Sequence, residues 1–270
     1  MHVWGGTTMT VNGNIIGDGQ LRKQDGGTLV TTGTNTYTGT TTIVAGTILV
    51  NGTHTGGATY SVSAGLLGGT GSTASAIAIS GTGVLDSGAP NTADALATGN
   101  VTFTGGEFQA QIGADTATTA GTSNDVVTVT GGVALGAGVA TLDLTSLGFT
   151  PTGTNYLYTL IDNDLVDPTT GTFNGLAEGA TVTVAGVDYN IYYNGGDGND
   201  VVLVEATAAT VAYVDDAWAG FSNGQGIADA DLGATGGQAA IIGLNAFASV
   251  TDALAAVGTG GTVILNSGTY

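Results

Sequence analysis

The chain has 270 residues, of which 49 are glycine and only 9% are charged, so its composition fits neither a highly charged disordered chain nor a coiled coil. The glycines follow no Gly-X-Y period, which excludes collagen. The 21 acidic residues outnumber the two basic residues, Arg22 and Lys23, and the net charge of −19 excludes nucleic-acid binding, which depends on many Lys and Arg side chains. Because there is no cysteine, disulfides and thiolate chemistry are excluded as well.

Residues 7–205 consist of short runs rich in Thr, Val and Ile, separated by Gly, Asn and Asp. Such runs are typical of β-strands. A unit of turn, glycine and apolar pair recurs at Gly46, Gly65 and Gly83, at intervals of 19 and 18 residues. This interval suits one coil of a β-helix, in which each coil buries its inward side chains against the next. We therefore predict an all-β fold whose main part is a parallel β-helix, or solenoid, over residues 7–145.

Residues 146–205 differ in composition from the residues before them, since they hold most of the tyrosines of the chain and several acidic turns. We expect them to form hairpins, that is, an antiparallel β cap over the end of the solenoid. Within them, Thr181–Val184 alternates polar and apolar residues, which predicts a strand with one buried face. Residues 1–205 are thus expected to form one module.

Residues 206–270 are expected to begin a second β-helix. A lead-in at 206–212 precedes a strand at 213–215 and a Gly-rich loop at 217–245. One short helix follows, because four apolar residues fall at i, i+3, i+7 and i+10. These residues are Phe247, Val250, Leu254 and Val257. Asn245 is the expected N-cap, Gly258 the expected C-terminal stop, and Thr262–Leu265 the final strand.

Residues 17–50 carry a family resemblance. The string Asn35-Thr36-Tyr37-Thr38-Gly39, together with the glycines that precede it and Thr41-Thr42-Ile43 after it, resembles the autotransporter-associated β-strand repeat of bacterial passenger and surface proteins. Asp25 and Thr31 depart from the pattern of that family at one turn and at one inward position. The resemblance implies a β-helical scaffold that is extracellular or on the bacterial cell surface, and that is not an enzyme.

Residues 213–270 resemble the first coil of a right-handed β-helix of the pectate-lyase-like type. The segments Ala246–Val250 and Gly261–Ile264 carry this likeness. It implies that the helix caps the first coil and that the coils bearing the catalytic residues of a lyase are absent from this sequence.

Residues 195–203 match one copy of the calcium-binding nonapeptide, with Asp200 at its acidic position. Calcium in such repeats lies between successive copies, and only one copy is present. An acidic hairpin turn is therefore the preferred interpretation. No other cofactor is expected.

Other polar and aromatic residues are interpreted as structural. Asp162, Asp164 and Asp167 fall in a predicted loop, and the adjacent Asp215 and Asp216 are expected to point to opposite faces. The two histidines, His2 and His54, have neither a metal-ligand spacing nor a neighbouring nucleophile in sequence. We expect Trp4 and Trp218 to close the two ends of the core, with sugar stacking as the alternative.

These observations favour a non-catalytic structural or adhesive β-helical module of a bacterial surface protein. We predict head-to-tail association into a homo-oligomer or filament, through open β edges at Val263, Ile264, Leu265 and Tyr270. The alternative is the leading, non-catalytic part of a polysaccharide-binding or polysaccharide-lyase-like protein, with a cell-surface or glycan ligand. No apolar run is long enough for a transmembrane helix, and the start of the sequence lacks the features of a signal peptide, so we expect the export signal to lie outside this sequence.

Overall fold

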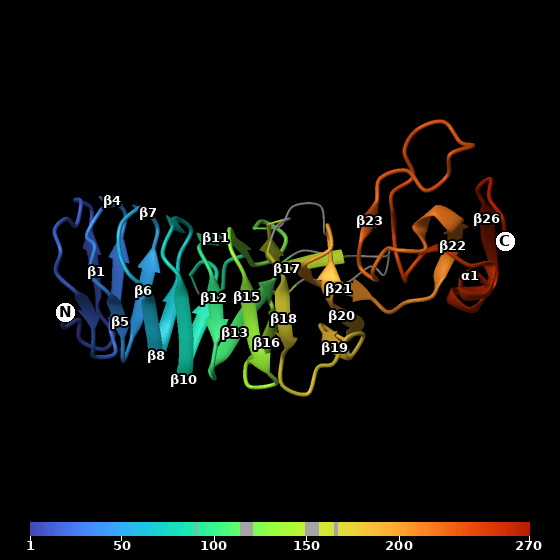
Figure 1. Ribbon diagram of the computed structural model, residues 1–270. Helices are drawn as coiled ribbons and strands as arrows, with labels where there is room; N and C mark the ends of the chain where they lie inside the picture. The colour runs from blue at the N-terminus through green and yellow to red at the C-terminus, as the bar shows by residue number, and fades with distance from the viewer. Residues whose placement is uncertain (90, 114–120, 149–156, 165–166) are drawn as a thin grey trace.

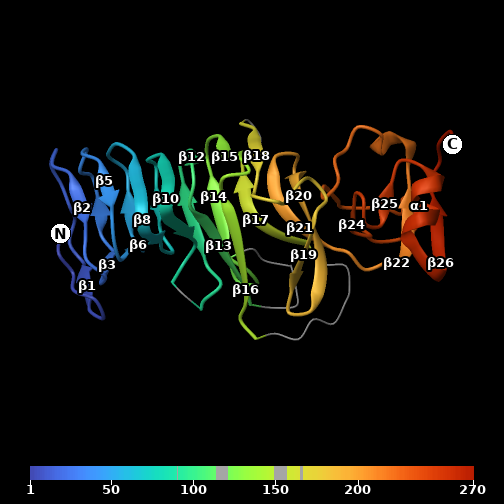
Figure 2. The same ribbon diagram turned by 90° about the horizontal axis from the view of Figure 1, so that it is seen from below.

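A computed structural model of the chain describes residues 1–89, 91–113, 121–148, 157–164 and 167–270. The strands are stacked along one axis, from the N-terminus at one end to the last strand and the single α-helix at the other (Figure 1). The same order is visible from below (Figure 2). The prediction of an all-β solenoid with a short helix near the C-terminus is confirmed.

Two faces of the stack belong to one twelve-stranded sheet, joined where long strands turn a corner. Its strands are β1 (Thr8–Val11), β2 (Leu21–Lys23), β3 (Thr28–Thr31), β5 (Thr41–Ile43), β6 (Thr47–Val50), β8 (Tyr60–Gly68), β10 (Ile77–Asp86), β12 (Val101–Phe103), β13 (Glu107–Ile112), β15 (Val133–Ala137), β16 (Thr141–Ser146) and β18 (Thr169–Thr172). The first half of β8 pairs with β5 and its second half pairs with β6, so this strand links the two faces. All the pairings within this sheet are parallel.

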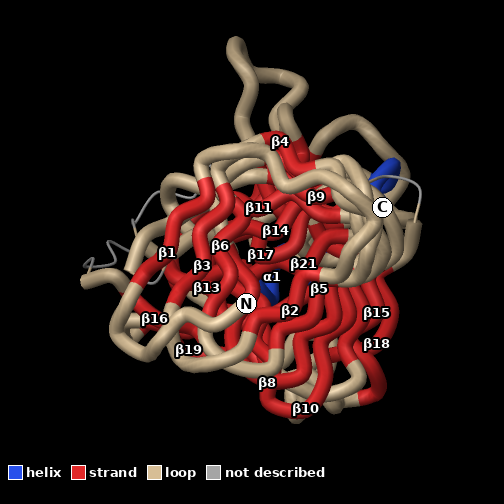
Figure 3. Tube along the Cα trace, turned by 90° about the vertical axis from the view of Figure 1, so that its left-hand side faces the viewer, coloured by secondary structure: helices blue, strands red, loops and turns tan. Residues whose placement is uncertain are grey.

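The third face is a nine-stranded sheet. Its strands are β4 (Thr34–Asn35), β7 (Thr53–His54), β9 (Ser72–Thr73), β11 (Ala95–Thr98), β14 (Val126–Val129), β17 (Leu157–Asn163), β19 (Thr181–Val184), β20 (Val187–Gly195) and β21 (Asp200–Glu205). Seen from the N-terminal end, strands of successive coils lie behind one another around a common interior (Figure 3). The chain therefore winds through three strand faces per coil.

The predicted coil interval agrees with the strand register. Thr28 pairs with Thr47, 19 residues later, and Thr47 pairs with Leu66 after another 19. Farther along the coils lengthen, and Glu107 pairs with Thr141, 34 residues later. The stacking continues although the interval changes, because the longer coils still bring their strands into parallel register.

Inward side chains of successive coils form apolar ladders. One ladder consists of Leu29, Ile48, Leu67, Leu85 and Phe108, each in register with the next and none more than 1% exposed. Burying such side chains stabilises the fold by about 1.5–3 kcal/mol each. The glycines at the corners allow successive coils to approach each other closely. A Cβ on Gly46, whose φ is +69°, would lie 2.3 Å from the Asp25 carbonyl oxygen of the preceding coil.

The predicted antiparallel cap is present. β20 pairs antiparallel with β19 and β21, and β21 pairs antiparallel with β17. In β19, Val182 and Val184 are more buried than Thr181 and Thr183, with which they alternate, as predicted. Parallel stacking extends farther than residue 145, because β17 and β18 still pair parallel with the preceding coil.

The C-terminal part contains β22 (Ala209–Val214), β25 (Ala246–Phe247) and β26 (Val257–Leu265) in one parallel sheet. A 3₁₀ turn, η1 (Asp216–Trp218), and a small pair of strands, β23 (Gly226–Ile227) and β24 (Ala240–Ile241), lie in the loop that was predicted as Gly-rich. The helix α1 spans Val250–Ala256.

The predicted ends and face of the helix were wrong in part. Ser249 caps α1 by accepting from the Asp252 N–H, whereas the Asn245 side chain accepts from Ile241 N–H in the preceding turn. The helix ends at Ala256 with Val257 as its C-cap, so the predicted stop, Gly258, is the first residue after the cap. Leu254, expected on the buried face, is 61% exposed, because Ala253 takes the position that faces β22.

Candidate functional sites

The C-terminal end of the stack has an open β edge. Among the described residues, β26 pairs along one side only, with β22. The Asn266 N–H donates to the Val214 carbonyl oxygen, at 2.9 Å. Because backbone groups of successive strand residues point alternately to the two sides, those of Ile264 also face β22, and those of Val263 and Leu265 point outward. The open edge therefore consists of the backbone groups of Val263 and Leu265, which are two of the four residues predicted to mediate association.

The side chains at this end differ in exposure. Leu265 and Tyr270 are each about half exposed, and Val263 packs beside α1. The Tyr270 hydroxyl lies 2.9 Å from the carbonyl oxygens of Val214 and Asn266, so this ring folds back onto β22. Tyr270 thus holds the terminal turn, and Leu265 presents its side chain to solvent.

The N-terminal end has an equivalent edge, formed by β1. Within the described part of the chain, β1 pairs only with β3. Thr28 N–H donates to the Thr7 carbonyl, at 2.9 Å, and Thr32 N–H donates to the Val11 carbonyl, at 3.1 Å. By the same alternation, Thr8 and Thr10 direct their N–H and C=O groups outward.

The two ends differ in charge. Both basic residues of the chain lie in β2, in the first coil, and residues 206–270 contain five aspartates and no Lys or Arg. Arg22 is exposed, whereas Lys23 is fully buried. The Lys23 ammonium donates to the carbonyl oxygens of Asp25 (2.7 Å), Gln24 (3.2 Å) and Ala45 (3.3 Å), and burial lowers its pKa.

A buried carboxyl pair lies where the coils lengthen. Asp86, at the end of β10, and Asp125, just before β14, are both fully buried, and their carboxyls lie close enough to interact. Asp125 Oδ1 accepts from Asp94 N–H (2.9 Å), and its Oδ2 accepts from Gln111 N–H (2.7 Å). Burial raises the pKa of Asp86 to about 7 and that of Asp125 to about 8. The two residues are 39 positions apart, so no sequence spacing pointed to this pair.

A second buried polar group surrounds His54. Its ring stacks on Tyr37 with centroids 4.1 Å apart, and its two nitrogens lie 2.9 Å from the Tyr60 hydroxyl and 3.0 Å from the Tyr37 carbonyl oxygen. The Tyr37 hydroxyl is 2.5 Å from Thr41 Oγ1. Both ring nitrogens are thus engaged within the core, which supports a structural role. His2 is exposed and lies 2.7 Å from Asp25 Oδ2.

The calcium-like motif forms the turn between β20 and β21, where Tyr192 pairs with Val202. Asp200 is buried, and its Oδ1 accepts from Asn163 N–H at 2.8 Å. Burial, followed by the nearby carboxylates of Asp197 and Asp162, raises the pKa of Asp200 to about 7. No group of three His, Asp or Glu side chains placed to hold a metal ion occurs within the described ranges.

The other acidic residues have structural contacts. Asp162 lies in β17 and not in a loop, and Asp164 N–H donates to the Val129 carbonyl. Asp215 caps η1 and accepts from the Asn266 amide (3.2 Å), while Asp216 accepts from Thr269 N–H (3.1 Å). Residues 165–166 of the predicted loop lie outside the described residues.

One of the two tryptophans, Trp4, does not lie where it was expected, at the end of the core. Trp4 is 74% exposed, so it does not close the core, because the first coil turns its neighbour Val3 inward instead. Trp218 is buried and packs with Ala230, Ile242 and Ala246 in the C-terminal core cluster.

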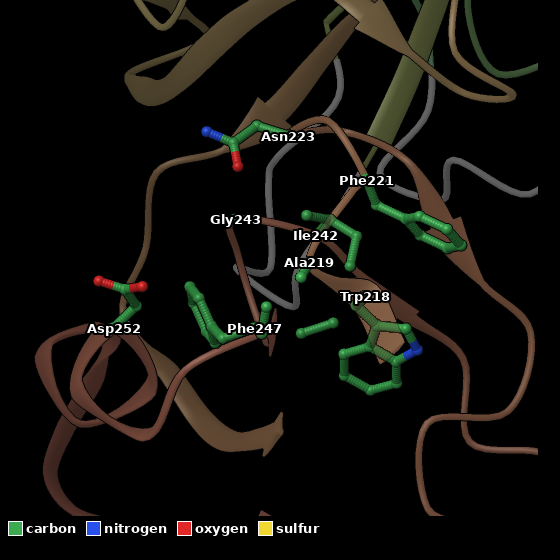
Figure 4. Close-up of a pocket in the computed structure, with 10 residues that line it drawn as sticks. Trp218, Ala219, Phe221, Asn223, Ile242, Gly243, Phe247 and Asp252 are labelled. Atoms are coloured by element: carbon green, nitrogen blue, oxygen red, sulfur yellow. The ribbon is translucent and has the colours of Figure 1, made fainter. Parts of the chain in front are cut away.

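Trp218 also lines a pocket of about 410 Å³. Figure 4 shows Phe221 and Phe247 on its walls, with Asn223 and Asp252 at its rim. Phe221 is half exposed, whereas the Asp252 carboxylate accepts from Ser249 Oγ at 2.6 Å. The pocket offers aromatic surface, one amide and one carboxylate.

The chain has no match among known protein families, curated proteins or solved structures. In the part of the chain that is described, no helix is long and apolar enough to cross a membrane.

Proposed function

We propose that the chain is a non-catalytic, extracellular structural module of a bacterial surface protein, acting as a stiff spacer. The observation that carries this proposal is the parallel stack of coils from β1 to β18 around one apolar core. A stack of this kind holds its two ends at a fixed separation, since each coil adds one strand spacing of about 4.8 Å. The net charge of −19 opposes unspecific association along its sides.

The likeness of residues 17–50 to the autotransporter-associated repeat supports the same proposal. The residues of that motif serve coil stacking here: Tyr37 lies in the core against His54, and Thr41 starts β5 with its side chain buried. The motif thus has a structural role in this fold, as expected of a scaffold repeat.

The spacer is proposed to join end to end with further copies. The outward backbone groups of Val263 and Leu265 at one end are complementary to those of Thr8 and Thr10 at the other, because an unpaired strand edge pairs readily with another strand. The distribution of charge favours contact between the C-terminal end of one copy and the N-terminal end of the next. The two basic residues lie in the first coil, whereas every charged residue of the C-terminal part is acidic. Two C-terminal ends would repel each other.

Negative-stain electron microscopy and light scattering test this joint. Leu265→Pro removes one outward N–H while leaving the β22 ladder intact, and Pro is tolerated on edge strands. It is expected to abolish filaments, as is Thr10→Pro at the other end. Leu265→Thr is the matched control, because it removes the apolar side chain but keeps the N–H, and it should still assemble. Unchanged assembly in both proline variants would refute the joint, whereas monomers that are not rod-shaped would refute the spacer.

Polysaccharide binding is the second candidate, and the pocket beside Trp218 is the observation that favours it. Sugar rings stack on exposed aromatic faces and bond to amide and carboxylate groups. A glycan array with the whole chain tests this candidate, with Phe221→Ala as the binding variant. Loss of binding in that variant is expected, and an array without signal would exclude the candidate.

A further inference from the structure

The buried pair Asp86 and Asp125 is the feature that a spacer leaves unexplained. Two carboxyls in an apolar core contribute less to packing than two apolar side chains would, and their charges oppose folding. Asp86 Oδ1 is buried without a hydrogen-bond donor. The contact holds only when at least one of the two groups keeps its proton, because two carboxylates at hydrogen-bond distance repel each other.

The pair ties together segments that are far apart in sequence. Asp125 accepts from the backbone of Asp94 and of Gln111, and the Gln111 side chain donates to Asp86 Oδ2 at 3.3 Å. Gln111 Oε1 also accepts from Thr92 N–H at 3.2 Å. Residues 91–94 are therefore held against β13 and β14 by bonds that converge on the two carboxyls.

No positive charge compensates the pair. Asp94, on the held segment, is acidic as well, and its charge also raises the pKa of Asp86. The only Lys and Arg of the chain, Lys23 and Arg22, belong to the first coil. A proton is thus the only neutralising group that the chain offers at this corner.

We propose that Asp86 and Asp125 share a proton that fastens residues 91–94 to the solenoid, and that this corner opens when the proton is lost to water. At acidic and neutral pH, the protonated carboxyl donates to its partner. Above the range in which the pair ionises, the two carboxylates repel each other, and this repulsion displaces Asp125 from its donors at Asp94 and Gln111. The middle coil then loosens, while the coils on either side keep their own ladders. This device is independent of the spacer function and of end-to-end joining.

Hydrogen exchange on the whole chain between pH 4 and pH 9, corrected for the intrinsic rate, tests the proposal. The amides of Asp94 and Gln111 report directly, because both donate to Asp125. Their protection should fall by up to about tenfold per pH unit from above the ordinary aspartate pKa of 3.8 to about pH 7, and should level off once the closed pair has lost its proton. In Asp86→Asn this fall should disappear. Asp18→Asn, which changes an exposed acid in the first coil, should behave as the wild type does.

Two results would overturn the proposal. One is a pH dependence that persists in Asp86→Asn. The other is a gain of protection at pH 9 on adding calcium chloride that exceeds the gain on acidification, since it would assign the pair to a cation. If Asp86→Asn fails to fold, carbon NMR of the wild-type carboxyls decides: two groups that titrate like ordinary aspartates would also refute the shared proton.

Discussion

Replacing Lys23 by methionine tests how the first two coils are held together. The Lys23 side chain is fully buried, and its ammonium donates to three carbonyl oxygens that belong to the corners of successive coils. Methionine keeps most of the apolar stem but has no donor. The substitution therefore leaves the carbonyls of Gln24, Asp25 and Ala45 without this partner.

The magnitude follows from the geometry of the three bonds. The contact with Asp25 is short, at 2.7 Å, whereas those with Gln24 and Ala45 are 3.2 and 3.3 Å. A hydrogen bond to a charged group contributes about 1.5–3 kcal/mol when well formed, and the two longer bonds contribute less. Removing the buried charge recovers part of its desolvation cost. We expect a net loss of about 2–4 kcal/mol in the free energy of unfolding.

Urea denaturation followed by circular dichroism measures the global effect, and hydrogen exchange over residues 21–45 measures the local one. Arg22→Met is the matched control, because it removes the same charge from the neighbouring position of β2, where the side chain is exposed. It should change stability by less than about 0.5 kcal/mol. Equal losses in the two variants would refute the reasoning, since they would mean that charge alone matters and not the carbonyl contacts.

Three further predictions concern packing, backbone and pH. Phe108→Ala should destabilise the chain by about 3–5 kcal/mol in urea denaturation, because Phe108 is fully buried between two ladder neighbours. Gly46→Ala should lower the melting temperature, since its φ of +69° and a Cβ 2.3 Å from the Asp25 oxygen both oppose a side chain; an unchanged melting temperature would contradict this. The stability that protonated Asp200 contributes is present below its ordinary pKa of 3.8 and lost as pH rises through about 7, so Asp200→Asn should flatten the melting temperature between pH 4 and 7.

Patterns among neighbouring residues were sufficient to predict the features that backbone geometry controls, namely the coil length and the buried face of a strand. The interval between Gly46 and Gly65 gave the coil length, because each corner needs a positive φ and each coil must reach its neighbour. Alternation predicted the buried face of β19 for the same local reason. The helix was harder: Ser249 and Asn245 are both good N-caps, and only the turn that engages Asn245 decides between them.

The sequence by itself determined that the chain is a stack of short parallel strands with an acidic surface, because strand propensity, glycine corners and net charge are properties of neighbouring residues and of composition. Tertiary structure alone decided which polar groups meet. Asp86 and Asp125 come together only because lengthened coils return the chain to the same corner, and His54 becomes a core residue only because Tyr37 and Tyr60 stack around it. The two basic residues make the same point: Arg22 and Lys23 are adjacent in sequence, yet strand alternation exposes one and buries the other.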